Sequence, residues 1–382
     1  MEKSIYVFLA NKLVSCDAIL PLLFELRKKR NVNKIYFYTT DIKTYNVIKK
    51  NFVLFEGINN IGELKFLGKK DSSLFQSVIK LIKIFFFMIK TIFLLYFNNV
   101  NIIHFNLVNF FPWKILYYIN KKRIFLFANT WGTKLEFDIT NIGGRREKTR
   151  FSISDPKAGT IVVFNKDSTY FIDKRVKSTN IELIDITVNF KSWMEYIDKN
   201  YIYFINKEFK DFFPKNVYTI TLGTFISPVY LNSKDSVEKC LVDTLDVLTE
   251  FDSEAIILIK PHAISSEEIY KNIISNYIKN KIYITFLHPS VLTKISKVFI
   301  CNYYSTTLAI AKKCGVPTIE YTEYSSEALE ISNRGSMRPD LVDYFINKDK
   351  IELKDTLKNI SIKNNNNIKY NSADSNILNL LS

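Results

Sequence analysis

Short apolar runs, each ending in a polar or glycine-containing loop and followed by a stretch with helical spacing, recur along both halves of this chain. In the first half, the run at 5–10 leads through such a loop to a helical stretch at 18–29 and to a second run at 34–38. The second half restarts the pattern at 217–222. A repeated β-loop-α-β order predicts parallel sheets covered by helices. We therefore expect an α/β protein with two Rossmann-like domains that face a central cleft.

The length of the chain also favours two domains, since single hydrophobic cores stop growing well below 382 residues. Hydrophobic residues make up 47% of the sequence, which excludes a disordered protein. The pattern places the first domain at 1–185 and the second at 216–350, joined by a connection at 186–215. Residues 351–382 are expected to form a C-terminal tail, loosely ordered around the asparagine run at 364–367.

The net charge of +15 favours an anionic partner. The sequence has no zinc-finger spacing and no aromatic RNA-binding signature, so we expect no nucleic-acid partner. An anionic membrane surface or an anionic glycan is favoured instead. The four cysteines form no CxxC pair, and the first residues lack the apolar run of a signal peptide. Both features predict a cytoplasmic protein in a reducing compartment.

The segment 78–97 is nearly long and apolar enough to span a bilayer, but it carries Lys80, Lys83 and Lys90. Each of these lysines costs roughly 2.5 to 3.5 kcal/mol at the centre of a membrane, which argues against a transmembrane helix. One interpretation is a core helix whose lysines mark the wet edge. The other is a basic, aromatic-rich helix that lies on the inner face of the cytoplasmic membrane. Both interpretations are compatible with each other.

Ligands of open α/β sheets bind beyond the carboxyl ends of the strands, so the residues that follow each strand are the candidate binding residues. A lysine there can neutralise phosphate, a histidine can donate to a phosphate or ribose oxygen, and hydroxyls at a helix start suit an anion. Ordinary roles are the alternatives: a surface lysine, a His-Pro turn, or a Ser/Thr helix cap. The candidate donor-binding residues are Gly223, Thr224, Lys260, His262, His288, Ser305, Thr306 and Thr307.

The first half supplies candidates for a general base, which an inverting transferase needs beside the acceptor hydroxyl. They are Asp17, His104, Glu136 and Asp138, and for each carboxylate the alternative is a solvated surface charge. No DxD pair, HExxH motif or His/Cys cluster is present, so we expect no metal cofactor. The absence of GxGxxG and Walker motifs argues against a nicotinamide oxidoreductase or a kinase.

Residues 1–180, with the segments IIHFN, LFANTWGTKLEF and TIVVFNKDS in this order, resemble the N-terminal domain of GT-B glycosyltransferases. The segments AIILIKPH and VFICNYYSTTLAIAKKCGVPTIEY, within 215–345, are similar to bacterial sialyltransferases and Kdo-transferase-like enzymes that use CMP-activated sugars. The resemblance implies that Lys260, His262 and residues 305–307 hold the nucleotide. Ala263 stands where many of these enzymes have a second proline, and their acidic segment that carries the base has no counterpart here.

These observations predict a metal-independent, inverting glycosyltransferase that moves a sugar from a nucleotide-sugar donor to a bacterial surface glycan or its lipid-linked precursor. The leading donor is a CMP-activated sialic-acid-like or Kdo-type sugar, and the product is lipopolysaccharide, lipooligosaccharide or capsule. Three alternatives stay open: a CDP-alditol phosphotransferase of the teichoic-acid polymerase kind, a nucleotide-sugar epimerase, and a non-catalytic scaffold on the same fold.

Overall fold

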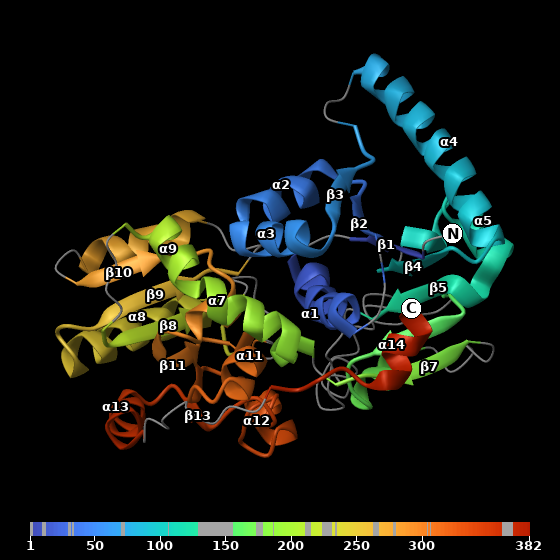
Figure 1. Ribbon diagram of the computed structural model, residues 1–382. Coiled ribbons are helices and arrows are strands. Elements are labelled where there is room, and N and C mark those ends of the chain that lie inside the picture. Colours follow the sequence, from blue (N-terminus) through green and yellow to red (C-terminus); the bar gives the residue numbers. More distant parts are fainter. Residues whose placement is uncertain are drawn as a thin grey trace. The chain divides into compact units, whose positions relative to one another are not determined.

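The computed structural model contains two compact α/β units, shown as ribbons in Figure 1. Unit 1 comprises the described residues of 1–132, 147–195 and 370–382, and unit 2 those of 196–369. The residues that the structure describes are 3–9, 13–29, 32, 34–69, 73–105, 107–128, 156–172, 179–185, 187–210, 215–223, 231–233, 235–262, 267–277, 280–303, 305, 307–360 and 370–382.

Unit 1 is built on a seven-stranded sheet in the order β3-β2-β1-β4-β5-β6-β7, in which all neighbouring strands are parallel. Its strands are β1 (Ser4–Phe8), β2 (Lys34–Thr39), β3 (Glu63–Phe66), β4 (Val100–His104), β5 (Ile124–Phe127), β6 (Thr160–Val163) and β7 (Asn180–Leu183). Its helices are α1 (Leu13–Lys29), α2 (Ile42–Lys50), α3 (Phe52–Ile61), α4 (Leu74–Tyr96), α5 (Lys114–Asn120) and α14 (Ser375–Leu381). Short 3-10 turns are η1 (Leu107–Asn109), η2 (Lys121–Arg123), η3 (Asp167–Phe171) and η4 (Thr187–Asn189).

Unit 2 is built on a six-stranded, all-parallel sheet in the order β10-β9-β8-β11-β12-β13. Its strands are β8 (Val217–Thr221), β9 (Ile256–Lys260), β10 (Lys281–Ile284), β11 (Ser296–Cys301), β12 (Thr318–Thr322) and β13 (Tyr344–Asn347). Its helices are α8 (Ser236–Phe251), α9 (Glu267–Ile274), α10 (Pro289–Leu292), α11 (Thr307–Lys313), α12 (Ser326–Ile331) and α13 (Lys350–Asn359), with the turn η5 (Ser275–Tyr277). Helix α7 (Lys191–Glu208) begins in unit 1 and ends in unit 2.

Both sheets have the strand order of a Rossmann fold, 3-2-1-4-5-6 when each unit is numbered from its own first strand. In each unit the chain moves outward from a central strand to one edge and then returns to the other side of that strand. The return creates a topological switch point between β1 and β4 in unit 1 and between β8 and β11 in unit 2. The predicted fold class of two Rossmann-like α/β domains is confirmed.

The central strands are buried along almost their whole length, as expected for parallel strands with helices on both faces. In unit 2, apolar residues of α8 such as Leu241 and Leu245 pack against Ile220, Ile257 and Ile300 of the sheet in one core. Polar side chains therefore lie at the strand ends and at the edges of the helix faces, where they can form hydrogen bonds.

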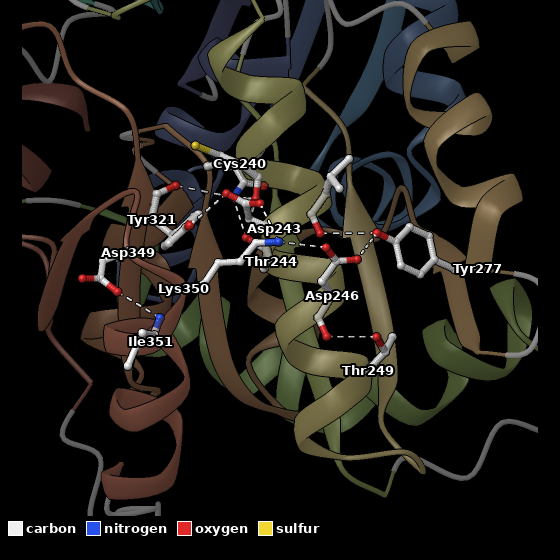
Figure 2. A network of polar contacts seen from close by, with 12 residues as sticks. Cys240, Asp243, Thr244, Asp246, Thr249, Tyr277, Tyr321, Asp349, Lys350 and Ile351 are labelled. Carbon is white, nitrogen blue, oxygen red and sulfur yellow. Dashed lines mark hydrogen bonds and ion pairs between the residues drawn. The ribbon is translucent and has the colours of Figure 1, made fainter.

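A polar network joins α8 to the elements around it (Figure 2). The Tyr321 hydroxyl, on β12, donates to Asp243 at 3.0 Å, and the Lys350 ammonium at the start of α13 lies 2.9 Å from both Asp243 and Asp246. Tyr277 donates to Asp246 at 2.6 Å. Burial opposes ionisation of Asp246, but hydrogen bonds from Tyr277 and Lys350 lower its pKa overall. The network therefore fixes α13 and η5 against the helix that covers the sheet.

The C-terminal segment differs from the expected loose tail. Residues 350–359 form α13 in unit 2, and residues 375–381 form α14 in unit 1. Helix α14 is ordered because Ile377, Leu378 and Leu381 are buried, and the Asn101 amide of β4 donates to the Leu381 carbonyl at 2.8 Å. The helical spacing of these three apolar residues allows them to be buried together, which the polar composition of the surrounding segment did not indicate. The asparagine run itself lies outside the described residues.

The lysine-bearing segment 78–97 falls within α4, a 23-residue helix. Among the helices in the described part of the chain, none combines the length and the apolar character needed to cross a bilayer. Ile84, Phe87 and Ile92 of α4 pack against the core of unit 1, where Phe87 contacts the Trp113 ring at a centroid distance of 5.7 Å. The interpretation as a core helix is therefore correct for one of its faces.

Replacement of Tyr321 by Phe is expected to lower the free energy of unfolding of unit 2 by about 1 kcal/mol, because the hydrogen bond to Asp243 is lost while the packing of the ring remains. Tyr344→Phe, on the exposed strand β13, is the matched control and should leave stability unchanged. Denaturant unfolding of the full chain measures both. Equal effects of the two substitutions would contradict a stabilising role for the network.

Candidate functional site

Three adjacent strands of unit 2 end at the same level of the sheet. Thr221 of β8 is the register partner of both Lys260 on β9 and Cys301 on β11. The next residues stay paired, since the Leu222 N–H donates to the Lys260 carbonyl at 3.0 Å and the Asn302 N–H donates to the Thr221 carbonyl at 3.3 Å. The loops that follow β9, β8 and β11 therefore leave the sheet side by side, around the β8/β11 switch point.

Gly223 follows β8 and lies against Tyr303, which follows β11. A Cβ atom at Gly223 would lie 2.6 Å from the Cβ of Tyr303 and 2.7 Å from its ring. No residue with a side chain fits there unless the two loops move apart. The glycine thus lets the backbones approach closely at the switch point, and this is a packing requirement of the kind expected beside a ligand site.

Asn302, directly after β11, is a residue that sequence reasoning missed. Its side chain is fully buried and donates to the Thr244 hydroxyl at 2.9 Å and to the Cys240 carbonyl at 3.2 Å, both on α8. It also lies 3.4 Å from the Tyr321 carbonyl on β12. The amide therefore fixes the start of the β11 loop to the neighbouring helix and strand. A buried asparagine that interrupts an apolar strand end is the signal that identifies it.

Glu323 plays a similar part at the end of β12. Its carboxylate accepts hydrogen bonds from Ser236 at 2.8 Å, from Asn232 at 3.0 Å and from Lys348 at 2.6 Å. Burial opposes its ionisation, but these three donors lower the pKa of Glu323 overall. The first turn of α8 is thereby held against the ends of β12 and β13, beside the switch point.

Among the predicted hydroxyl residues, Ser305 and Thr307 are described and Thr306 lies outside the described residues. Both described residues are half-buried. The Ser305 hydroxyl accepts a hydrogen bond from the Thr307 N–H at 3.2 Å, at the start of the seven-residue helix α11. Ser305 therefore has the capping contact that its residue type favours, within the loop that follows β11.

Lys260 ends β9 and its ammonium donates to the Leu287 carbonyl at 2.9 Å. This contact directs it toward the loop after β10. Glu208, from α7, accepts from the Phe286 N–H at 2.9 Å in the same region. Burial raises the pKa of Glu208, while hydrogen bonds and the charge of Lys260 act in the opposite direction. A lysine and a partly buried carboxylate therefore share this end of the sheet.

The two predicted histidines of unit 2 differ in their surroundings. His262 is half-buried in the loop after Lys260 and Pro261, next to the switch-point strand. His288 follows β10 and is buried, and its Nδ1 accepts from the Ser290 N–H at 3.1 Å to cap α10. Thr224, predicted beside Gly223, lies outside the described residues. The structure thus brings Gly223, Lys260, His262 and Ser305 to adjacent strand ends, with His288 one strand further out.

A buried carboxylate lies beneath this edge, on β12. Glu320 is fully buried and accepts hydrogen bonds from the Ser336 and Tyr324 hydroxyls. Burial raises the pKa of Glu320 to about 7, and the two hydrogen bonds offset the shift only in part. Its register partner on β11 is Cys301. The carboxyl group therefore titrates near neutral pH inside the sheet of unit 2.

Two candidate bases lie near the β1/β4 switch point of unit 1. His104 is the last residue of β4 and pairs in register with Phe8 of β1, and Asp17 is half-buried on α1, the helix that follows β1. Burial lowers the pKa of His104 to about 3, although the backbone of Lys157 acts in the opposite direction. His104 is thus uncharged at neutral pH but is a weak base. Glu136 and Asp138 lie outside the described residues.

Within the described residues, no group of three or more His, Cys, Asp or Glu side chains is arranged to hold a metal ion. The expectation of a metal-independent site stays a prediction.

No protein-family model matches the sequence, and no curated protein matches it either. The fold does match solved structures. A protein of Listeria monocytogenes assigned as a UDP-N-acetylglucosamine 2-epimerase superposes with a TM-score of 0.51 at 10% identity, over 94% of this chain and 87% of that one. An Anabaena protein in complex with UDP and glucose gives a TM-score of 0.48 at 10% identity, over 94% and 89%. A UGT transferase of Siraitia grosvenorii in complex with UDP gives 0.45 at 8% identity, over 93% and 91%. At these identities the match shows the fold alone.

Replacement of Gly223 by Ala is expected to lower the free energy of unfolding by about 1–3 kcal/mol, because the new methyl group overlaps Tyr303 and forces the loops after β8 and β11 apart. Gly335→Ala is the control, since its nearest neighbour, the Ser332 carbonyl, would lie at 3.4 Å in ordinary contact. Denaturant unfolding compares the two. A Gly223 variant as stable as the control would show that the close approach is not required.

Ionisation of Glu320 is expected to lower the free energy of unfolding as the pH rises. Its pKa is raised in the folded state, so between about pH 4.5 and 7 the folded chain binds more protons than the unfolded chain, and stability decreases as the pH rises. The loss is about 3 kcal/mol across that window. Glu320→Gln should remove this pH dependence. Relative to the wild type, the free energy of unfolding of this variant should therefore increase as the pH rises to 7 and above. Denaturant unfolding across this pH range measures it, and parallel profiles for the two proteins would rule out a raised pKa.

Proposed function

We propose that this chain is a glycosyltransferase that uses a nucleotide-activated sugar, with the donor held by unit 2 at the β8/β11 switch point. The observation that carries the proposal is the common level at which β9, β8 and β11 end, set by the register of Thr221 with Lys260 and Cys301. Nucleotides bind at such switch points in open parallel sheets. The GT-B fold and its nucleotide-sugar-binding relatives support the same conclusion.

The reaction requires stabilisation of a leaving nucleotide. The acceptor oxygen forms a bond to the anomeric carbon of the sugar, the bond between that carbon and the phosphate oxygen breaks, and the electron pair leaves with the phosphate. Lys260 supplies positive charge for this oxygen, His262 supplies a hydrogen-bond donor, and Ser305 to Thr307 supply hydroxyls. Gly223 lets the loop after β8 lie directly against Tyr303 of the loop after β11.

An inverting reaction also needs a base that takes the proton from the acceptor hydroxyl, and Asp17 and His104 are candidates from the sequence. The low pKa of His104 makes it a weak proton acceptor, so we propose Asp17 in preference to it. Glu136 and Asp138 remain candidates from the sequence. An inverting mechanism needs only one such base, which acts on the acceptor side.

The proposed donor is a CMP-activated sialic-acid-like or Kdo-type sugar, and the proposed acceptor is a surface glycan or its lipid-linked precursor. Resemblance of the segments around Lys260 and Ser305 to CMP-sugar enzymes supports the nucleotide. The charge of +15 supports an anionic acceptor and a location on the inner face of the cytoplasmic membrane. We propose that no metal ion takes part, since lysine, histidine and hydroxyl groups can stabilise the leaving phosphate.

A nucleotide-sugar epimerase is the second candidate, favoured by the fold match to the Listeria protein assigned to that activity. Reaction products separate the possibilities. An epimerase changes the sugar of the donor without an acceptor, a glycosyltransferase releases the nucleotide only when an acceptor is present, and a CDP-alditol phosphotransferase leaves a phosphodiester in its product.

Thermal-shift titration of the full chain with CMP, CDP, UDP and GDP tests the donor site. Binding stabilises the folded state by RT ln(1 + [L]/Kd), so the matched nucleotide at about 100 times its Kd adds about 2.7 kcal/mol and raises the midpoint. We expect CMP to give the largest shift. A preference for UDP or GDP would remove the CMP-sugar donor, and the absence of any shift would remove the nucleotide site.

Replacement of His262 by Ala is expected to reduce turnover at least about 100-fold while leaving the unfolding midpoint of the ligand-free protein unchanged, because the half-buried imidazole acts on the leaving group. His288→Asn is the matched control, since asparagine also caps helices and the His288 contact is a helix cap. Turnover with the donor found by titration measures both. Full activity of the His262 variant would assign this histidine a structural role.

A further inference from the structure

Helix α4 presents a second apolar face that the rest of the described chain leaves uncovered. Its large side chains recur at helical spacing and remain half-exposed or more, at 71% for Phe75, 60% for Phe85, 52% for Ile89 and 51% for Phe93. We define this row as the outer stripe. Its members are Phe75, Val78, Ile82, Phe85, Phe86, Ile89, Phe93 and Tyr96.

The outer stripe lies on the side of α4 that points away from the core. The core-facing residues Met88, Thr91 and Leu95 occupy positions about half a turn from it, because residues three and four apart share a face of a helix. The buried residues of α4 begin only at Met88, so its first three turns contribute none. In Figure 1 these turns extend clear of the sheet of unit 1. The helix is therefore apolar on two opposite faces.

The charged side chains around the outer stripe are all positive. Residues 72–135 contain neither Asp nor Glu, although the whole chain has 38 acidic residues. Lys83 and Lys90 are exposed and lie along one flank of the stripe, whereas Lys80 is half-buried on the opposite side of the helix. Within the described residues, none of these three lysines forms an ion pair. An exposed apolar row with an uncompensated row of cations complements a surface that is apolar inside and anionic outside.

The neighbouring segment has the same character. Phe110 and Phe111 are 65% and 82% exposed just before α5, and Tyr118 on α5 is 67% exposed. Lys121 and Lys122 follow on η2 and are also exposed. Helices α4 and α5 pack against each other, so this segment belongs to the same part of unit 1.

A second copy of this chain is a poorer occupant of the outer stripe. Pairing of two such helices would bring their lysine rows into one interface with no carboxylate on either side, since both come from the segment that lacks acidic residues. Like charges placed opposite each other are destabilising. A lipid bilayer accommodates the lysines instead, because their long side chains reach the headgroups while the aromatic rings enter the acyl boundary.

We infer that the outer stripe of α4 and its flanking lysines dock unit 1 onto an anionic lipid bilayer, with α4 lying along the membrane surface rather than crossing it. Three features carry the inference: the exposed apolar row, the lysine flank and the segment without carboxylates. It deepens the membrane location given under the proposed function by naming the element that makes the contact, and lipid binding by unit 1 does not depend on which reaction unit 2 performs.

Vesicle sedimentation of the full chain tests the docking in the absence of any nucleotide. The probes are vesicles of phosphatidylcholine alone and vesicles in which about one third of the lipid is phosphatidylglycerol. We expect binding to the anionic vesicles that weakens as salt is raised, since screening reduces the attraction. Absence of binding to both vesicle types would overturn the inference and would leave the nucleotide titration unaffected.

Two variants separate the apolar and the charged contributions. Phe85→Gln/Phe86→Gln/Phe93→Gln should weaken binding to anionic vesicles at least about 10-fold. Lys83→Gln/Lys90→Gln should weaken it about 30-fold while changing little on neutral vesicles. Because these side chains are largely exposed, the unfolding midpoint should stay the same. The matched controls, which should bind as the wild type does, are Ile202→Gln/Leu183→Gln/Ile351→Gln and Lys199→Gln/Lys210→Gln.

A fluorescent dye attached to α4 tests whether this helix contacts the membrane. All four native cysteines are buried and free, so an environment-sensitive dye can be attached selectively at Phe86→Cys, with Ile351→Cys as the control site. Anionic vesicles should shift the emission at position 86 to the blue and leave position 351 unchanged. Equal shifts at both positions would overturn the inference, as would a lipid-free dimer that is lost in the triple phenylalanine variant.

Discussion

The parallel pairing of two strands that are distant in the chain, β8 with β11, is the constraint on which unit 2 depends. Between β8 and β11 the chain forms the helices α8, α9 and α10 and the strands β9 and β10 before it returns to the central strand. Parallel strands with both faces covered carry mostly apolar side chains along their length. Polar groups therefore collect where the strands end, and the pairing of Thr221 with Cys301 and Lys260 brings three such ends to one level. Unit 1 repeats this arrangement between β1 and β4.

The groups that make the switch point rigid are buried polar side chains. Asn302 joins the end of β11 to α8 and β12, and Glu323 joins the first turn of α8 to the ends of β12 and β13. Each side chain forms hydrogen bonds with several buried polar groups. Those groups would lower the stability of the fold if they were left without a hydrogen bond in the interior. These contacts hold the end of β11 in place, as the proposed nucleotide site requires. Glu320 adds a carboxyl group whose protonation changes near neutral pH within the same sheet.

The sequence predicted what depends on local pattern. Alternation of apolar runs and helical stretches identified the two Rossmann-like units. Partners distant in the chain leave no such local signal. The buried surroundings of His104 and the partners of Asn302 follow from tertiary packing. Helix α4 was the intermediate case, since its apolar residues were evident but only the structure shows that two opposite faces carry them.

The return of the chain to unit 1 after unit 2 has a consequence for biosynthesis. Helix α14 covers part of unit 1, and its Leu381 carbonyl accepts the hydrogen bond from the buried Asn101 side chain. A ribosome makes residues 375–381 only after it has synthesised all of unit 2. Until then β4 lacks a partner for this amide and the surface under Ile377 and Leu381 is open to water. The first unit to be translated is therefore the last to be completed.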